Sequence, residues 1–99
     1  MTTLTIDSSP DAKLAALAHV GNRFGADYSS IICRDEADRL LSVSVLAHGE
    51  TMRRLRRYRP RAERRGTFFS RPLDGGWAVY ADGEYAEFLE RWLKRQESR

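Results

Sequence analysis

The sequence predicts a single α+β domain, spanning residues 1–99, in which helices pack on one face of an antiparallel sheet. Its length of 99 residues suffices for one hydrophobic core, and a content of 41% hydrophobic and 31% charged residues is typical of globular chains. Some segments alternate apolar and polar residues, which indicates strands. Other segments repeat apolar residues every three or four positions, which indicates helices.

The N-terminal segment predicts a strand followed by a helix. Residues 2–7 alternate between apolar and polar side chains, as a half-buried strand does. Ser9 and Pro10 then supply a helix N-cap and a first helical residue. The helical pattern continues to Gly25, which is suited to end it.

Two β-rich runs follow, at residues 28–33 and 39–46, and the polar link 35–38 is suited to a hairpin. The residues of the second run that are expected to face the core are Leu41, Val43 and Val45. A competing interpretation starts from the threonine-rich first segment, which resembles the opening of ribbon-helix-helix repressors. In that fold, residues 28–41 would form a second helix.

Residues 50–66 predict a basic helix and a basic loop. Met52, Leu55 and Tyr58 share one helical face, and arginines fill the other. Pro60 is expected to end the helix, because proline disfavours helical geometry in the residue before it.

The last third of the chain predicts a hairpin and a helix. Residues 67–70 and 77–80 are the expected strands, and residues 72–76 are the expected turn. Asp82 is the expected N-cap of an amphipathic helix over residues 83–96, which begins with acids and ends with bases, as the helix dipole favours.

The expected order is therefore β-α-β-β-α-β-β-α. Its first six elements resemble a ferredoxin-like split β-α-β core, to which a strand and a C-terminal helix are added. ACT-type and RNA-recognition domains share this layout. However, the glycine-bearing turn of the former is replaced by residues 8–10, and the central-strand aromatics of the latter are absent from residues 39–45.

Positive charge is concentrated in one segment. Residues 50–65 hold eight of the fifteen arginines and two glutamates, a net charge of +6, whereas the whole chain carries +3. Such asymmetry indicates an electropositive surface for an anionic partner. The residues expected to contact that partner are Arg53, Arg54, Arg56, Arg57, Tyr58, Arg61, Arg64 and Arg65.

The sequence gives little support for catalysis, metal binding or membrane insertion. Two histidines and the single Cys33 do not form a metal-ligand motif, and no nucleophile motif is present. Cys33 follows two isoleucines and is expected to be buried. No enzyme activity, cofactor, metal or small-molecule ligand is predicted. Without a signal or membrane-spanning segment, the expected location is the cytoplasm.

Two functions remain open. The first is a non-catalytic nucleic-acid-binding protein that contacts phosphates through the arginine-rich helix. The second is a protein-protein interaction module, such as an adaptor or a phage or mobile-element inhibitor, that sets the same arginines against an acidic surface. A homodimer formed through a sheet edge or the last helix is compatible with both. The aromatic residues that follow the arginines could stack on bases, but their spacing favours core packing: Phe68, Phe69, Trp77 and Tyr80.

Overall fold

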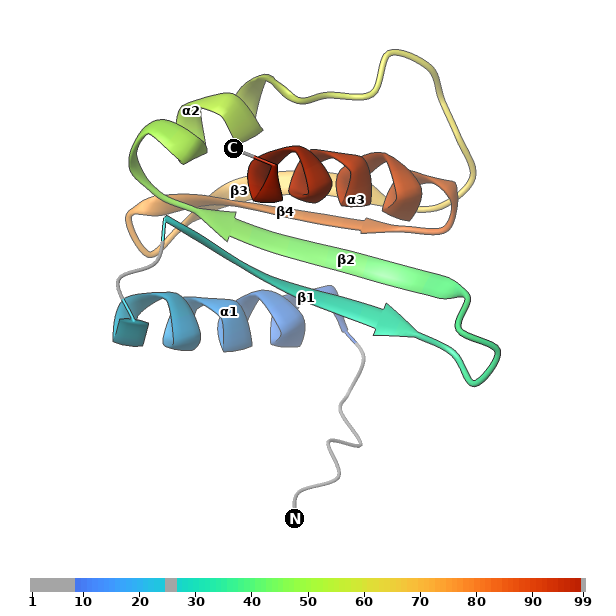
Figure 1. Ribbon diagram of the computed structural model, residues 1–99, viewed down its shortest axis with the longest axis horizontal. Coiled ribbons are helices and arrows are strands. Elements are labelled where there is room, and N and C mark those ends of the chain that lie inside the picture. Colours follow the sequence, from blue (N-terminus) through green and yellow to red (C-terminus); the bar gives the residue numbers. More distant parts are fainter. Residues whose placement is uncertain (1–8, 25–26, 99) are drawn as a thin grey trace.

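In the described part of the chain, three helices and a four-stranded antiparallel sheet form one small domain (Figure 1). The computed structural model describes residues 9–24 and 27–98. The strand expected over residues 2–7 lies outside the described residues. The elements in chain order are α1 (Pro10–Phe24), β1 (Tyr28–Arg34), β2 (Leu40–Ala47), α2 (Gly49–Arg57), β3 (Phe68–Leu73), β4 (Gly76–Asp82) and α3 (Glu84–Glu97).

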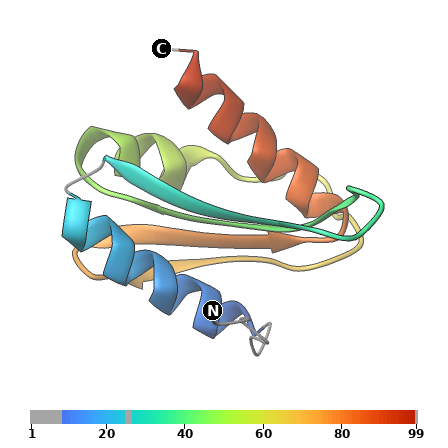
Figure 2. The same cartoon turned by 60° about the horizontal axis from the view of Figure 1, so that its bottom comes forward.

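The prediction of an α+β domain with an antiparallel sheet is confirmed, but the ferredoxin-like arrangement is wrong. The described order is α-β-β-α-β-β-α, and the strands lie in the order β1-β2-β4-β3. The helices also cover both faces of the sheet. Helix α1 packs on one face, and α2 and α3 pack on the other (Figures 1 and 2).

The two central strands explain this arrangement, because residues on both of their faces are buried. Val43 and Val45 of β2 belong to the core under α2 and α3, whereas Leu46 belongs to the core under α1. In β4, Val79 belongs to the core under α2 and α3, and Tyr80 belongs to the core under α1. A strand that is apolar on both faces has to be covered on both, so a single layer of helices cannot complete this fold.

Helix α1 begins as predicted and covers its face with leucines. The Ala12 amide donates a hydrogen bond to Ser9 Oγ at 3.2 Å, which is the expected N-cap contact. Leu14 and Leu17 are buried against the sheet. Lys13 extends from the same helix and donates to Ser42 Oγ at 3.0 Å. The sheet face opposite α2 and α3 is therefore a second core rather than a solvated surface.

The β1–β2 hairpin is confirmed, which excludes the ribbon-helix-helix alternative. Asp35 Oδ1 accepts hydrogen bonds from the Ala37 and Arg39 amides, both at 2.9 Å. The Arg39 amide is the main reason why the pKa of Asp35 lies below its ordinary value. The expected inward position of Leu41 is wrong: it is 49% exposed. A bulge is the reason, because Arg34 pairs with Leu40 while Cys33 pairs with Ser42, which leaves Leu41 without a partner.

The second hairpin has a tighter turn than the sequence pattern indicated. Strand β3 continues to Leu73, and the turn consists of Asp74 and Gly75, with φ angles of 52° and 78°. Two successive positive φ angles are typical of a type I′ turn, for which Asp-Gly is a preferred pair. Pro72 consequently lies within β3. An edge strand tolerates proline, since its missing amide can face away from the ladder.

Helix α3 is confirmed, but its predicted cap is wrong. Gly83 occupies the N-cap position with φ 60°, and no side chain caps the helix there. The Asp82 carboxylate instead accepts hydrogen bonds from the Thr67 amide at 2.7 Å and from the Tyr80 hydroxyl at 2.9 Å. The apolar face of α3, including Trp92, is buried in the core.

Tyr80 is expected to make folding stability sensitive to alkaline pH. The residue is 4% exposed. Burial first, and then the hydrogen bond to Asp82, raise the pKa of Tyr80 to about 12. Because the unfolded pKa is about 10, the neutral phenol stabilises the fold fully below pH ~10, and this contribution is lost as the pH rises from ~10 to ~12.

Urea unfolding at pH values below and inside this window tests the prediction. The wild type is expected to lose more stability on going to high pH than Tyr80→Phe, because phenylalanine cannot ionise. The other titrating groups, including Tyr58, are common to both proteins and cancel in the comparison. Equal losses in the two proteins would show that Tyr80 does not cause the pH dependence.

Candidate functional site

The arginine-rich segment forms the predicted amphipathic helix, α2. On its inward face Thr51 and Leu55 are buried, and Met52 packs against the core that contains Leu55. The outward face carries Arg53, Arg56 and Arg57, all exposed. The helix ends at Arg57, three residues before Pro60. Burial of Leu55 thus fixes which way the arginines point.

The arginines of α2 differ in how far their charge is engaged. Arg53 lies 3.4 Å from Glu50 in an exposed ion pair, which contributes little to stability. Arg54 is half-buried and donates to Thr51 Oγ1 at 3.2 Å. Arg57 has no ion-pair partner among the residues that the structure describes. Arg53 and Arg57 are therefore open to an external anion, and Arg54 is less so.

The basic loop after α2 is held in place by backbone hydrogen bonds to the β4–α3 junction. The Arg64 amide donates to the Tyr85 hydroxyl and the Arg65 amide donates to Glu84 Oε2, both at 2.9 Å. In return, the Glu84 amide donates to the Arg65 carbonyl at 2.8 Å. These contacts fix the loop backbone, while the side chains of Arg61 and Arg65 lie exposed on it.

Gly66 allows the loop to approach this junction closely. Its φ is +120°, and a Cβ atom there would collide with the Asp82 carbonyl oxygen and lie 3.0 Å from Gly83 Cα. Only glycine adopts such a conformation without strain. The position of the basic loop therefore depends on the absence of a side chain at Gly66.

Tyr58 anchors the start of the loop to α3. Its ring stacks on Phe88 with centroids 4.2 Å apart, and its hydroxyl donates to the Phe88 carbonyl at 2.6 Å. The Arg95 guanidinium lies 5.6 Å from the Tyr58 centroid, and the Arg64 guanidinium lies 5.2 Å from the Phe88 centroid. Phe88 and Arg95 are about 10.5 Å apart along the helix, which leaves room for one ring between them. The half-buried Tyr58 is thus occupied by internal contacts.

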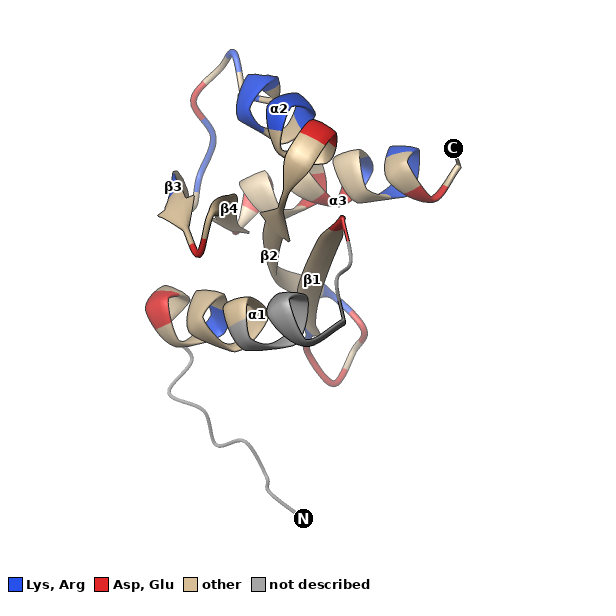
Figure 3. Cartoon of the chain, turned by 90° about the vertical axis from the view of Figure 1, so that its left-hand side faces the viewer, with Lys and Arg blue, Asp and Glu red and all other residues tan. Residues whose placement is uncertain are grey.

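This stack places α3 next to the loop, so that the arginines of α2, the basic loop and α3 form one basic surface. Burial raises the pKa of Tyr58, and the positive charges of Arg95, Arg91 and Arg64 act against that rise. Arg91 lines one pocket with Arg64, and Arg95 lies over the Tyr58 ring. Figure 3 shows the basic positions of α2, the loop and the end of α3 on the same side of the sheet. The sequence had indicated only that bases at the end of α3 suit its dipole. Nothing local shows that the loop folds back against them.

The described residues offer little other chemistry. No group of three His, Cys, Asp or Glu side chains among them could hold a metal ion. Cys33 is only partly buried, contrary to expectation, because it lies on the edge strand β1. A pocket of about 310 Å³ beside Arg64 and Arg91 is also lined by Glu84 and Glu87, so its charge is mixed. Within the described part of the chain, no helix is long and apolar enough to cross a membrane.

No protein-family model, curated protein or solved structure matches this chain. The chemistry of the surface therefore has to be judged from its own residues. Guanidinium groups donate two parallel hydrogen bonds to phosphate or carboxylate, and they remain charged at any physiological pH. A helix and an anchored loop that carry several of them form a positively charged surface.

Proposed function

We propose that this protein is a non-catalytic nucleic-acid-binding protein that contacts phosphates through the outward face of α2 and the basic loop. The observation that carries the proposal is the fixed, one-sided placement of exposed arginines. Arg53, Arg56 and Arg57 extend from a helix whose opposite face is buried, and Arg61 and Arg65 extend from an anchored loop. A polyphosphate backbone presents repeated charges to match such an array.

Arg91, which lines one pocket with Arg64, and Arg95, which lies over the Tyr58 ring, extend the same surface onto α3. Tyr58 supports the surface from below by joining the loop to α3. Contacts of this kind provide affinity without base specificity, so similar binding to duplexes of different sequence is expected.

The test is fluorescence anisotropy of labelled oligonucleotides titrated with the protein over a series of salt concentrations. Binding at micromolar concentration or tighter, with a salt dependence that corresponds to roughly 4 to 6 neutralised phosphates on duplex, is the expected result. Absence of binding at low salt would refute the proposal. An acidic protein partner would then be the better explanation, and it would be sought by affinity capture after nuclease treatment.

A further inference from the structure

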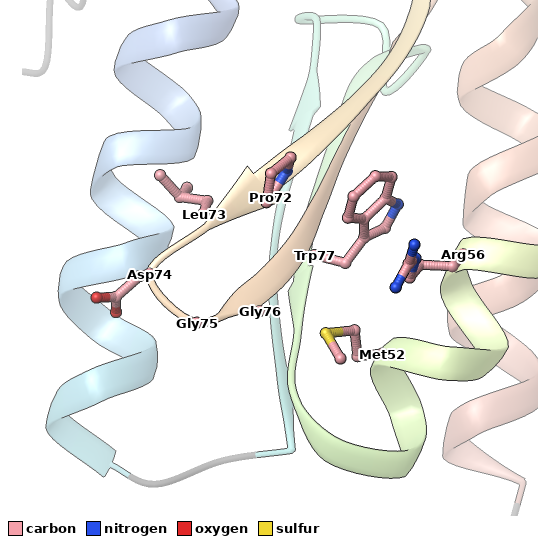
Figure 4. Close-up of a pocket in the computed structure, with 8 residues that line it drawn as sticks. All are labelled: Met52, Arg56, Pro72, Leu73, Asp74, Gly75, Gly76 and Trp77. Carbon is pink, nitrogen blue, oxygen red and sulfur yellow. The ribbon is translucent and has the colours of Figure 1, made fainter.

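A groove lies between α2 and the tip of the β3–β4 hairpin, next to the basic surface. Its volume is about 520 Å³, within the range of small-ligand sites. In Figure 4 the side chains of Met52, Arg56 and Trp77 converge on it, whereas Asp74 points away from them. The residues that line it are Met52, Arg56, Pro72, Leu73, Asp74, Gly75, Gly76 and Trp77.

The two walls of the groove are connected by His48. This residue is the N-cap of α2, and its Nε2 lies 3.2 Å from the Asp74 carbonyl oxygen at the hairpin tip. Because a carbonyl only accepts, Nε2 is the donor. Gly76 permits the close approach, since a Cβ there would lie 2.9 Å from the His48 ring and collide with the Ala47 carbonyl. The groove is therefore framed by fixed elements.

Trp77 is the aromatic surface of the groove. It is only partly buried, and the Arg56 guanidinium lies 4.7 Å from its ring centroid. Within the described residues, Arg56 has no ion-pair partner to hold it there. An exposed cation–π contact is weaker than the stacking of a nucleobase on an aromatic ring. A base can therefore displace Arg56 from the ring, which frees the guanidinium for a phosphate.

From these contacts we infer that the groove binds an unstacked base of single-stranded nucleic acid, with Trp77 as the stacking platform. The inference rests on the proposed function and adds a preference for single strands. The charge arrangement supports it: Arg53 follows Met52 by one residue, about 100° around the helix, so the strand passes from the groove onto the arginine face of α2. The single acid of the groove, Asp74, points away from this path.

Three probes of equal length separate base stacking from phosphate contact: an oligothymidylate of roughly 12 nucleotides, an abasic strand with the same phosphates, and a duplex. The wild type is expected to bind oligothymidylate about tenfold more tightly than the abasic strand. Trp77→Ala is expected to remove this difference while leaving the abasic strand and duplex within about twofold. Trp77→Phe should retain most of it, because the ring remains.

Tryptophan emission gives a second readout. Oligothymidylate should quench it and the abasic strand should not. Trp92 is only 3% exposed, so a change in emission reports on Trp77. Phe69→Ala is the matched control, since it removes a partly buried aromatic from the same hairpin on the face packed against α1, and it should not change the preference.

The results distinguish base binding in the groove from phosphate binding by the basic surface. If Trp77→Ala weakens all three probes equally, or if the wild type does not distinguish oligothymidylate from the abasic strand, the groove is not a base site. The proposed phosphate-binding function would survive that result. If the wild type binds none of the probes, both proposals are refuted.

Discussion

A double variant, Arg53→Glu with Arg57→Glu, is expected to bind duplex nucleic acid about 100-fold more weakly than the wild type at ~0.1 M salt. Both side chains are exposed on the outward face of α2. Each reversal removes an attraction to phosphate and adds a repulsion. The slope of log affinity against log salt should fall by about two, because two fewer counterions are released.

The same variant should remain folded. The only interaction it removes among the described residues is the ion pair of Arg53 with Glu50, whose side chains are 71% and 76% exposed. A pair in that environment is worth little, and exposed substitutions usually change stability by about 0.5 kcal/mol or less. Urea unfolding curves of variant and wild type should therefore nearly coincide, so that lost binding reports on the surface itself.

Arg39→Glu with Arg71→Glu is the matched control, because it changes net charge by the same amount at other places. Arg39 pairs with Asp35 in the β1–β2 turn, and Arg71 pairs with Asp11 of α1. Neither belongs to the basic surface of α2, the loop and α3. If this control weakens binding as strongly as the α2 variant does, overall charge governs affinity, and the assignment of the site to α2 is wrong.

The local elements could be predicted from sequence because their signals are local. Ser9 and Pro10 start α1, the alternation in β2 gives a strand, and Met52 and Leu55 give α2 its inward face, although Tyr58, expected on the same face, lies just beyond the helix end. The arrangement of helices around the sheet is a different matter. Alternating valines and serines in β2 indicated one core face, but Ser44 is fully buried and Leu46 lies in the second core.

The apolar run of β4 carried the missing signal. Residues 77–81 are apolar without interruption, which is typical of a strand covered on both faces. The β-bulge beside Leu41 had no such signal, since the pattern continues through it.

In the candidate site, too, some features could be predicted from local sequence and others depend on contacts between distant segments. The outward face of α2 follows from helical periodicity, so Arg53 and Arg57 could be placed correctly on it, whereas Arg54, expected on the same face, is half-buried. The contribution of Arg91 and Arg95 could not, because it depends on Tyr58 stacking against Phe88, thirty positions further along the chain. The groove beside Trp77 could not be predicted either, because it requires that β3 pair with β4 next to α2.

Gly66→Ala is expected to have the largest effect on stability, a loss of about 3 kcal/mol or more. At φ +120° an alanine is strained, and its Cβ would meet the Asp82 carbonyl, which is backbone and cannot rotate away. The loop would have to shift. Such a shift would weaken the hydrogen bonds of Thr67 with Asp82 and of Arg65 with Glu84 that hold the basic loop.

Gly75→Ala separates conformational strain from close approach. Gly75 also has a positive φ, +78°, but nothing lies within 4 Å of a Cβ placed there. Its cost should therefore be the strain alone, about 1 kcal/mol. Urea unfolding followed by circular dichroism measures both variants. Equal costs would mean that the loop yields easily at the junction, and the arginines it carries would then not be held in the fixed array on which phosphate binding is argued.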